Sequence, residues 1–231
     1  MLRQSENKYI LPFLHALDAL LNKGIILVRV ADQMIVYANK GITDYYPMGV
    51  SKEEIALPTF FQSNMAENDY CEIASFIAKA RKHFGKNNSE LLSDYSFSFH
   101  FNSQFAGQAN VLHLQCAPIV DYSSVRFAIC FVSPSASEKQ GGFMIKSQSP
   151  EITLKFNPHT STFEKVTPIT LNVTEKLILI HTNHGLSVDE IATKINLTVN
   201  AVKSSKHRMF DKMGVKNISE AICYAENYRL L

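Results

Sequence analysis

The spacing of apolar residues changes near the start of the chain. From Tyr9 to Asn22, apolar side chains recur at every third or fourth position, which predicts a helix with one buried face. The dipeptide Lys23-Gly24 is typical of a helix end. The next two runs, 25–30 and 34–38, are β-rich and flank a short polar turn, so they predict a hairpin.

A helical region and three strand-like runs follow. Helical spacing within 52–84 is clearest from Glu67 to Phe84. The strand-like runs are 93–101, 110–118 and 125–132. This order of elements predicts an α+β domain in residues 1–133, with an antiparallel five-stranded sheet and helices covering one face.

Two features of this domain have alternative interpretations. Tyr95, Phe97, Phe99 and Phe101 alternate with polar residues and share one face of their strand. Such a stripe either belongs to the core or lines a ligand pocket. The helix 10–21 can cover the sheet or form the seam of a parallel dimer.

The element order of residues 1–133 and the sequence Tyr37-Ala-Asn39 after the second strand resemble a PAS domain. The resemblance implies a sensor and dimerisation module. A generic α+β domain remains the alternative.

A change of composition separates this domain from the rest. Residues 133–142 are rich in Ser, Pro and Gly, which is typical of a linker. Beyond it, the runs 142–147, 151–156 and 161–166 predict a small β-ribbon between two domains. We therefore expect a linker and ribbon over 134–169, and a second domain over 170–231.

The second domain contains the signals of two helices joined by a tight turn. Ser187 and Glu190 have the spacing of a capping box at the start of a short helix. Asn196 tolerates the left-handed conformation that a sharp turn requires. Thr198 can cap a second helix that runs to about Met213. This layout predicts a helix-turn-helix, which places its second helix in the major groove of DNA. An ordinary αα-hairpin is the alternative.

The second helix has an apolar and a polar face. Val202, Ser205, Met209 and Met213 share the first, and Asn200, Lys203, Ser204, His207 and Asp211 share the second. Lys203 can donate to guanine, and Asn200 can pair with adenine or hold a phosphate. We expect the flanking Lys206, Arg208 and Lys212 to contact phosphates, although such a cationic surface can also be merely solvated.

Several ordered motifs resemble the LuxR-type helix-turn-helix of bacterial transcription regulators, also called FixJ/NarL-type. They are Leu171-Asn-Val-Thr-Glu175, Gly185-Leu-Ser-Val-Asp-Glu-Ile-Ala192, Val202-Lys203, Lys212-Met-Gly-Val215 and Asn217-Ile-Ser-Glu-Ala221. The resemblance implies four helices, at about 174–182, 188–195, 199–213 and 219–228, the last a dimer contact.

By the same resemblance, Lys203, Ser204 and His207 occupy base-reading positions and Thr198 helps to hold the backbone. Ser205, Lys206 and Leu177 depart from the pattern. Lys206 lies near the buried flank and must extend its charge outward.

Composition and charge limit the other functions. The chain has 231 residues, of which 46% are hydrophobic and 19% charged, so it is neither disordered nor a polytopic membrane protein. The formal net charge of +2 lies entirely in residues 170–231. Cys71, Cys116, Cys130 and Cys223 form no C-x-x-C pair, and the start of the chain lacks a secretion signal. We expect a cytoplasmic protein with free thiols.

The sequence gives little support for metal binding, catalysis, phosphorylation control or acyl-homoserine-lactone binding. His181 and His184 have a spacing that could ligate a metal, but no carboxylate or cysteine completes the set, and histidines at a helix end help to cap it. No nucleotide-binding loop, nucleophile elbow or metalloprotease helix is present. The early hairpin lacks the acidic residues of a phosphorylated receiver domain. An acyl-homoserine-lactone pocket typically contains tryptophan, and the chain has none.

The sequence thus predicts a two-domain DNA-binding transcription regulator that is not an enzyme and has no cofactor, no metal and no membrane segment. We expect a homodimer on double-stranded DNA with two half-sites, and RNA polymerase as a partner. A small-molecule ligand in the N-terminal domain is open. The competing class is a protein-interaction adaptor whose helical C-terminal domain docks a protein partner.

Overall fold

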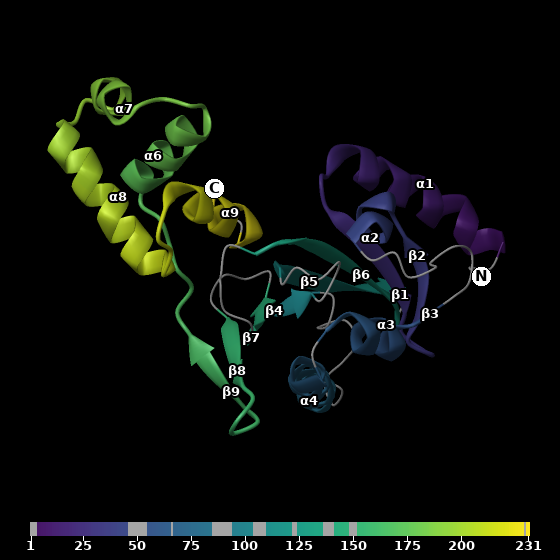
Figure 1. Cartoon of the computed structure of the whole chain (residues 1–231). Helices are drawn as coiled ribbons and strands as arrows, with labels where there is room; N and C mark the ends of the chain where they lie inside the picture. Colours follow the sequence, from purple (N-terminus) through teal and green to yellow (C-terminus); the bar gives the residue numbers. More distant parts are fainter. Residues whose placement is uncertain are drawn as a thin grey trace. The chain divides into compact units, whose positions relative to one another are not determined.

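The computed structural model describes residues 4–45, 55–65, 67–84, 94–103, 110–121, 124–135, 141–147, 152–228 and 230–231. The chain divides into two compact units, with the main boundary between Val166 and Thr167 (Figure 1). The N-terminal unit contains a large sheet, and the C-terminal unit is helical.

The described strands of the N-terminal unit form one antiparallel sheet in the order β3-β2-β1-β6-β5-β4-β7-β8-β9. The strands are β1 (Gly24–Arg29), β2 (Met34–Ala38), β3 (Ile55–Ala56), β4 (Tyr95–Ser103), β5 (Asn110–Asp121), β6 (Ser124–Pro134), β7 (Gly141–Ser147), β8 (Thr153–Asn157) and β9 (Thr162–Val166).

The sheet is larger than the five strands expected. Strands β1, β2, β4, β5 and β6 match the expected ones, and β3 adds a two-residue pairing with β2. The predicted ribbon is not a separate bridge, because β7 pairs with β4 and is followed by β8 and β9. This pairing satisfies the backbone groups on the second edge of β4, which would otherwise be an open sheet edge.

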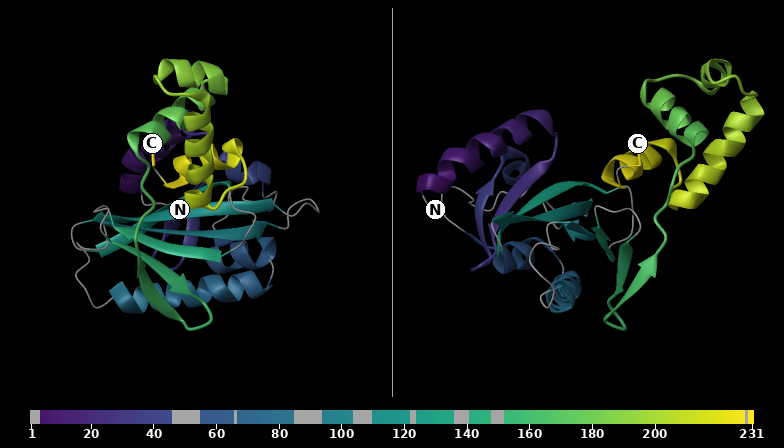
Figure 2. Two further views of the ribbon diagram at one scale, coloured as in Figure 1. Left: turned by 90° about the vertical axis from the view of Figure 1, so that its left-hand side faces the viewer. Right: turned by 180° about the vertical axis from the view of Figure 1, so that it is seen from behind.

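Helices cover both faces of the sheet, whereas the sequence predicted cover on one. Helices α3 (Leu57–Asn64) and α4 (Glu67–Phe84) lie on one face, and α1 (Gln4–Leu20) lies on the other (Figures 1 and 2). Five consecutive residues of β1 are buried. Ile26 and Val28 join the core under α3 and α4, and Ile25 and Leu27 join the core under α1. A strand that is apolar on both sides needs cover on both sides.

The aromatic stripe of β4 lies in the core on the α4 side. Phe76 of α4 is 1% exposed, and its ring centroid lies 5.2–6.4 Å from those of five other phenylalanines. These rings come from β4, β7, β8 and β9: Phe97, Phe99, Phe143, Phe156 and Phe163. One side chain therefore joins strands distant in sequence.

A buried asparagine joins the hairpin to the neighbouring helices. Asn39 precedes α2 (Lys40–Tyr45) and accepts hydrogen bonds from the backbone N–H groups of Ile25 (2.8 Å) and Ile42 (3.2 Å). Its amide group donates to Asp18 of α1 and to the carbonyl of Lys23. The motif Tyr37-Ala-Asn39 thus ends in a residue that fixes the junction of α1, β1 and α2.

The described part of the C-terminal unit contains four helices, α6 (Val173–Asn183), α7 (Val188–Lys194), α8 (Val199–Met213) and α9 (Ile218–Tyr228). Their bounds differ from the expected ones by at most one residue. Ile178, Leu179, Ile191, Val202 and Met209 form the centre of their common core. Among the described residues, no helix is long and apolar enough to cross a membrane.

Candidate nucleic-acid interface and ligand cavity

Local hydrogen bonds set the geometry of α7, the turn and α8. Ser187 caps α7: its hydroxyl accepts from the Glu190 N–H (3.4 Å), and the Glu190 carboxylate accepts from the Ser187 N–H (2.8 Å). The Ser187 hydroxyl also donates to the Glu190 carboxylate at 2.7 Å, and this bond, with that from the Ser187 N–H, holds the pKa of Glu190 below its ordinary value. Asn196 adopts φ 55°, the left-handed conformation expected for the turn. Thr198 then caps α8 by accepting from the Ala201 N–H at 3.1 Å.

One face of α8 is fixed in the core. Val202 and Met209 are fully buried, Met213 is 5% exposed and Ser205 is 8% exposed. Gly214 ends the helix with φ 66°, a left-handed conformation that suits glycine. Because the buried face is held from Val202 to Met213, about three turns of helix, the direction of the opposite face is also determined.

The opposite face presents polar side chains to solvent. Asn200, Lys203, Ser204 and His207 are all exposed. Within the described part of the chain, the side chains of Asn200, Lys203 and Ser204 form no hydrogen bond or ion pair. His207 lies 3.7 Å from Asp211, measured from Nε2 to Oδ2, a pair that carries opposite charges only when the imidazole is protonated.

The cationic side chains that flank this face differ in their exposure and in their partners within the protein. Arg208 is exposed and donates from Nη2 to the Ser205 hydroxyl at 3.3 Å. Lys206 is half-buried, as expected from its place near the buried flank. Lys212 donates from Nζ to both carboxylate oxygens of Glu175, at 2.7 and 3.0 Å. Lys212 thus contributes to the stability of the fold through Glu175, and the phosphate contact expected from the sequence stays a prediction.

The partner of Lys212 is a residue that the sequence analysis did not single out. Glu175 is 3% exposed and forms a second capping box with Asn172 at the start of α6. Burial raises its pKa, but the hydrogen bonds from Lys212 and Asn172 and the charges of Lys212 and Arg208 outweigh burial and leave the pKa below the ordinary value. The spacing N-x-x-E was a signal for the cap, whereas the contact with α8 spans 37 positions and left none.

The histidines considered as metal ligands lie at the end of α6. His184 is the C-cap residue, and its backbone N–H donates to the carbonyl of Ile180 at 3.1 Å. Among the described residues, no group of three or more His, Cys, Asp or Glu side chains is placed to hold a metal ion.

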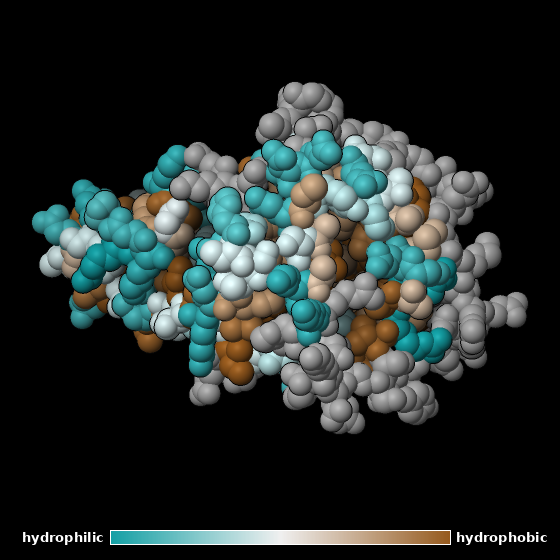
Figure 3. Space-filling model, turned by 90° about the horizontal axis from the view of Figure 1, so that it is seen from below, coloured by the Kyte–Doolittle hydropathy of each residue, from teal (hydrophilic) through white to brown (hydrophobic). Residues whose placement is uncertain are grey.

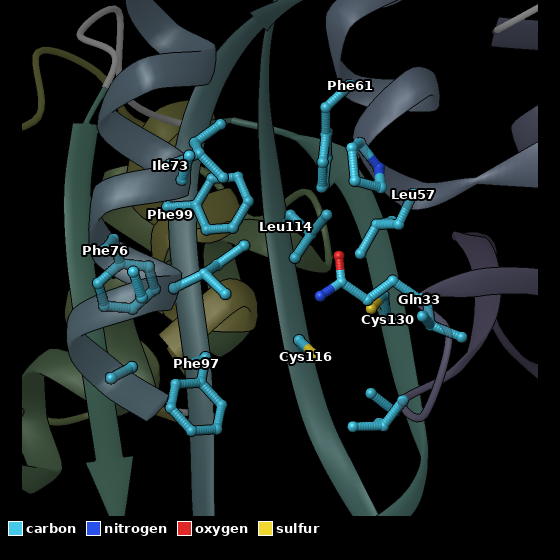
Figure 4. Close-up of a pocket in the computed structure, with 18 of the residues that line it drawn as sticks. Gln33, Leu57, Phe61, Ile73, Phe76, Phe97, Phe99, Leu114, Cys116 and Cys130 are labelled. Carbon is cyan, nitrogen blue, oxygen red and sulfur yellow. The ribbon is translucent and has the colours of Figure 1, made fainter. Parts of the chain in front are cut away.

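The N-terminal unit contains a cavity of about 550 Å³ between the sheet and helices α3 and α4 (Figure 4). Phe97 and Phe99 of the aromatic stripe line it, together with Phe61 and Phe76 from the helices. The stripe is thus both core and cavity wall. Viewed from below, the side on which α3 and α4 lie in Figure 1, hydrophobic residues are recessed among hydrophilic ones (Figure 3).

Two thiols face this cavity from neighbouring strands. Cys116 of β5 and Cys130 of β6 are directly paired in the sheet, and both are free cysteines. The hydrogen bond with Cys116, together with burial, raises the pKa of the Cys130 thiol. The Cys130 thiol is therefore neutral at physiological pH and hydrogen-bonded to Cys116.

Comparison with protein families matches residues 170–225 to the bacterial regulatory proteins of the luxR family. A comparison with curated proteins found no match. Among solved structures, the phage VqmA–DPO complex is 15% identical, with 99% of this chain and 94% of that chain covered and a TM-score of 0.40.

Two further structures are similar at the same level. A VqmA dimer of Vibrio cholerae, solved without target DNA, is 13% identical over 93% of this chain and 86% of that chain, with a TM-score of 0.31. A PAS domain from Colwellia psychrerythraea is 19% identical over 54% of this chain and 96% of that chain, with a TM-score of 0.39. Such TM-scores do not establish a common arrangement, so the assignment rests on the family match: residues 170–225 are a helix-turn-helix domain of the luxR family of bacterial regulatory proteins.

Proposed function

We propose that the protein is a sequence-specific DNA-binding transcription regulator in which α8 enters the major groove. The observation that carries this proposal is the outward face of α8. Asn200, Lys203 and Ser204 stand exposed and without hydrogen bonds within the described residues, on a helix whose other face is buried. Exposed polar groups near the start of such a helix are suited to base edges.

We assign separate roles to the residues of α8. Lys203, Ser204 and His207 contact bases, with Lys203 donating to guanine O6 or N7. Asn200 pairs with adenine or holds a phosphate. Thr198, Lys206, Arg208 and Lys212 hold the DNA backbone, because phosphate contact requires only a donor or charge within reach.

We further propose that the protein binds DNA as a homodimer. One helix-turn-helix buries little surface on DNA, so useful affinity requires two copies on two half-sites. The half-sites are then about one helical turn apart and related by two-fold symmetry.

Selection of bound sites from a random double-stranded DNA pool tests this proposal. The full chain is used at about 0.15 M salt, where weak electrostatic binding is screened. An enriched palindromic motif supports a dimeric, sequence-specific regulator. Unselective, salt-sensitive binding that cell extract does not convert into specific binding contradicts it and favours the protein-interaction adaptor.

A second function is favoured by the cavity of about 550 Å³. We propose that the N-terminal unit binds a small molecule there, since this volume lies within the range of roughly 300–1,000 Å³ typical of small-molecule sites. Isothermal titration of the full chain with candidate compounds tests this role independently of DNA. Failure to bind any compound that fits the cavity would contradict it.

A further inference from the structure

Gln33 has an unusual backbone conformation beside the cavity. It lies in the turn between β1 and β2 with φ 58°, in the left-handed region that glycine and asparagine tolerate best. Its carbonyl accepts a hydrogen bond from the Leu57 N–H at 2.8 Å, which joins the turn to the start of α3. The turn therefore uses only the backbone of Gln33, and its side chain takes no part in the turn.

That side chain reaches into the cavity. Figure 4 shows the Gln33 amide near the middle of the lining residues, between Leu57, Leu114 and Cys116. In the described residues, this amide group has no hydrogen-bond partner. An amide offers two donor hydrogens and an acceptor oxygen, and leaving them unpaired in an apolar site is unfavourable.

The rest of the described lining is nearly free of polar groups. It contains no Lys, Arg, His, Asp or Glu side chain, so a charged ligand would lose hydration without gaining an ion pair. Cys116 and Cys130 already share a hydrogen bond with each other. Apart from the Tyr70 hydroxyl, Gln33 is thus the polar group available to a ligand in this part of the structure.

The remaining described lining is apolar, and phenylalanine rings lie among its aliphatic side chains. Phe61, Phe76, Phe97 and Phe99 line the cavity from α3, α4 and β4. Their edges and faces favour a flat aromatic body, because aromatic pairs gain additional attraction in offset or edge-to-face packing.

We propose that the cavity takes a neutral, largely aromatic small molecule that carries a hydrogen-bond donor beside an acceptor, as a carboxamide does, and that Gln33 recognises this polar edge. The proposal rests on the ligand-binding role proposed above. Gln33 is then the specificity-determining residue, and the phenylalanines hold the apolar body.

Three probes of nearly equal shape test the chemistry: naphthalene-2-carboxamide, 2-acetylnaphthalene and naphthalene-2-carboxylate. The first has a donor and an acceptor, the second has only an acceptor, and the third is charged. Titration of each into the full chain is expected to give a dissociation constant about tenfold lower for the amide than for the ketone, because the ketone leaves one amide group of Gln33 unpaired. The carboxylate is expected to bind most weakly.

Two variants test the role of Gln33. Gln33→Leu removes the amide, and Gln33→Asn withdraws it by one methylene while keeping a residue that tolerates the left-handed turn. Both are expected to bind the amide and the ketone equally. Gln62→Leu, at an exposed glutamine of α3 outside the cavity, is expected to keep the tenfold preference.

Equal binding of amide and ketone by the unchanged protein overturns the proposal, as does strongest binding of the carboxylate or no binding of any probe. Preference for the amide that survives both Gln33 variants overturns the role of Gln33. The DNA selection is done without any probe, so its outcome does not depend on this one.

Discussion

The interactions that stabilise each unit internally differ in how far apart their partners lie along the chain. In the C-terminal unit, helices begin with hydrogen bonds between residues three positions apart, as in the pairs Asn172–Glu175 and Ser187–Glu190. In the N-terminal unit, β1 pairs with β6, so that Gly24 lies opposite Val132. The core around Phe76 gathers rings from four strands.

This difference determines what each unit tolerates. A helix that loses its cap loses one local interaction, and the common core still holds the helix. A sheet built on distant partners depends on the few side chains that bring those partners together. The predictions below test this contrast, beginning with the largest expected effect.

Removing the central ring of the N-terminal core is expected to have the largest effect. Phe76→Ala leaves a cavity among five phenylalanines and should lower the free energy of unfolding by about 3–5 kcal/mol. Urea denaturation followed by circular dichroism measures the change. Phe13→Ala, at a ring that is 55% exposed, is the control and should change stability by much less. Equal losses would contradict the central position of Phe76.

Lys212→Met tests a long-range ion pair of the helical unit. The substitution leaves the Glu175 carboxylate buried without its cation and should cost about 2 kcal/mol, since the lysine is itself partly exposed. The same denaturation experiment applies. Lys203→Met, on the same helix but without a partner within the described residues, should be nearly neutral. If neither substitution changes the free energy of unfolding, the ion pair contributes nothing to stability.

The pH dependence sharpens this second test. Because the pKa of Glu175 is lower in the folded protein than its ordinary value, its contribution is present at neutral pH and is lost as the pH falls through the folded pKa. Glu175→Gln should therefore be less stable than the unchanged protein at pH 7, and the difference should shrink on acidification below the ordinary pKa of glutamate. Glu226→Gln, at an exposed position, is the control. A difference that stays constant with pH would exclude the charge of Glu175 as its cause.

The smallest effect is expected from a local cap. Ser187→Ala removes the hydroxyl that accepts from the Glu190 N–H and should cost about 1 kcal/mol. Ser204→Ala removes the same hydroxyl from the interior of α8 and should cost less. A loss at Ser187 as large as that at Phe76 would contradict the contrast between the two units.

The same contrast explains what the sequence could predict. The bounds of α7 and α8 follow from Ser187, Asn196, Thr198 and Gly214, because each acts on its own neighbours. The exposed face of α8 follows from helical spacing. The strands were also identifiable, since alternation is a local pattern.

The features that the sequence did not predict depend on contacts between residues far apart in the chain. Nothing near residues 141–166 indicates that β7 pairs with β4, and nothing near Lys212 indicates Glu175 as its partner. Cover on both faces was visible in the unbroken apolar run Ile25-Ile-Leu-Val28, which the hairpin prediction did not use. The side chain of Gln33 gave no sequence signal, because its role depends on a left-handed turn beside α3 and the cavity.

The most direct test of the central claim is the ratio of affinities for a selected DNA site and a scrambled duplex, measured at about 0.15 M salt. Lys203→Ala should reduce this ratio about tenfold or more and relax the preference at one base position, because it removes a donor to a base edge. Lys165→Ala, at an exposed lysine of β9, should leave the ratio unchanged. If Lys203→Ala keeps the full preference for the selected site, α8 does not read DNA through this residue and the account is wrong.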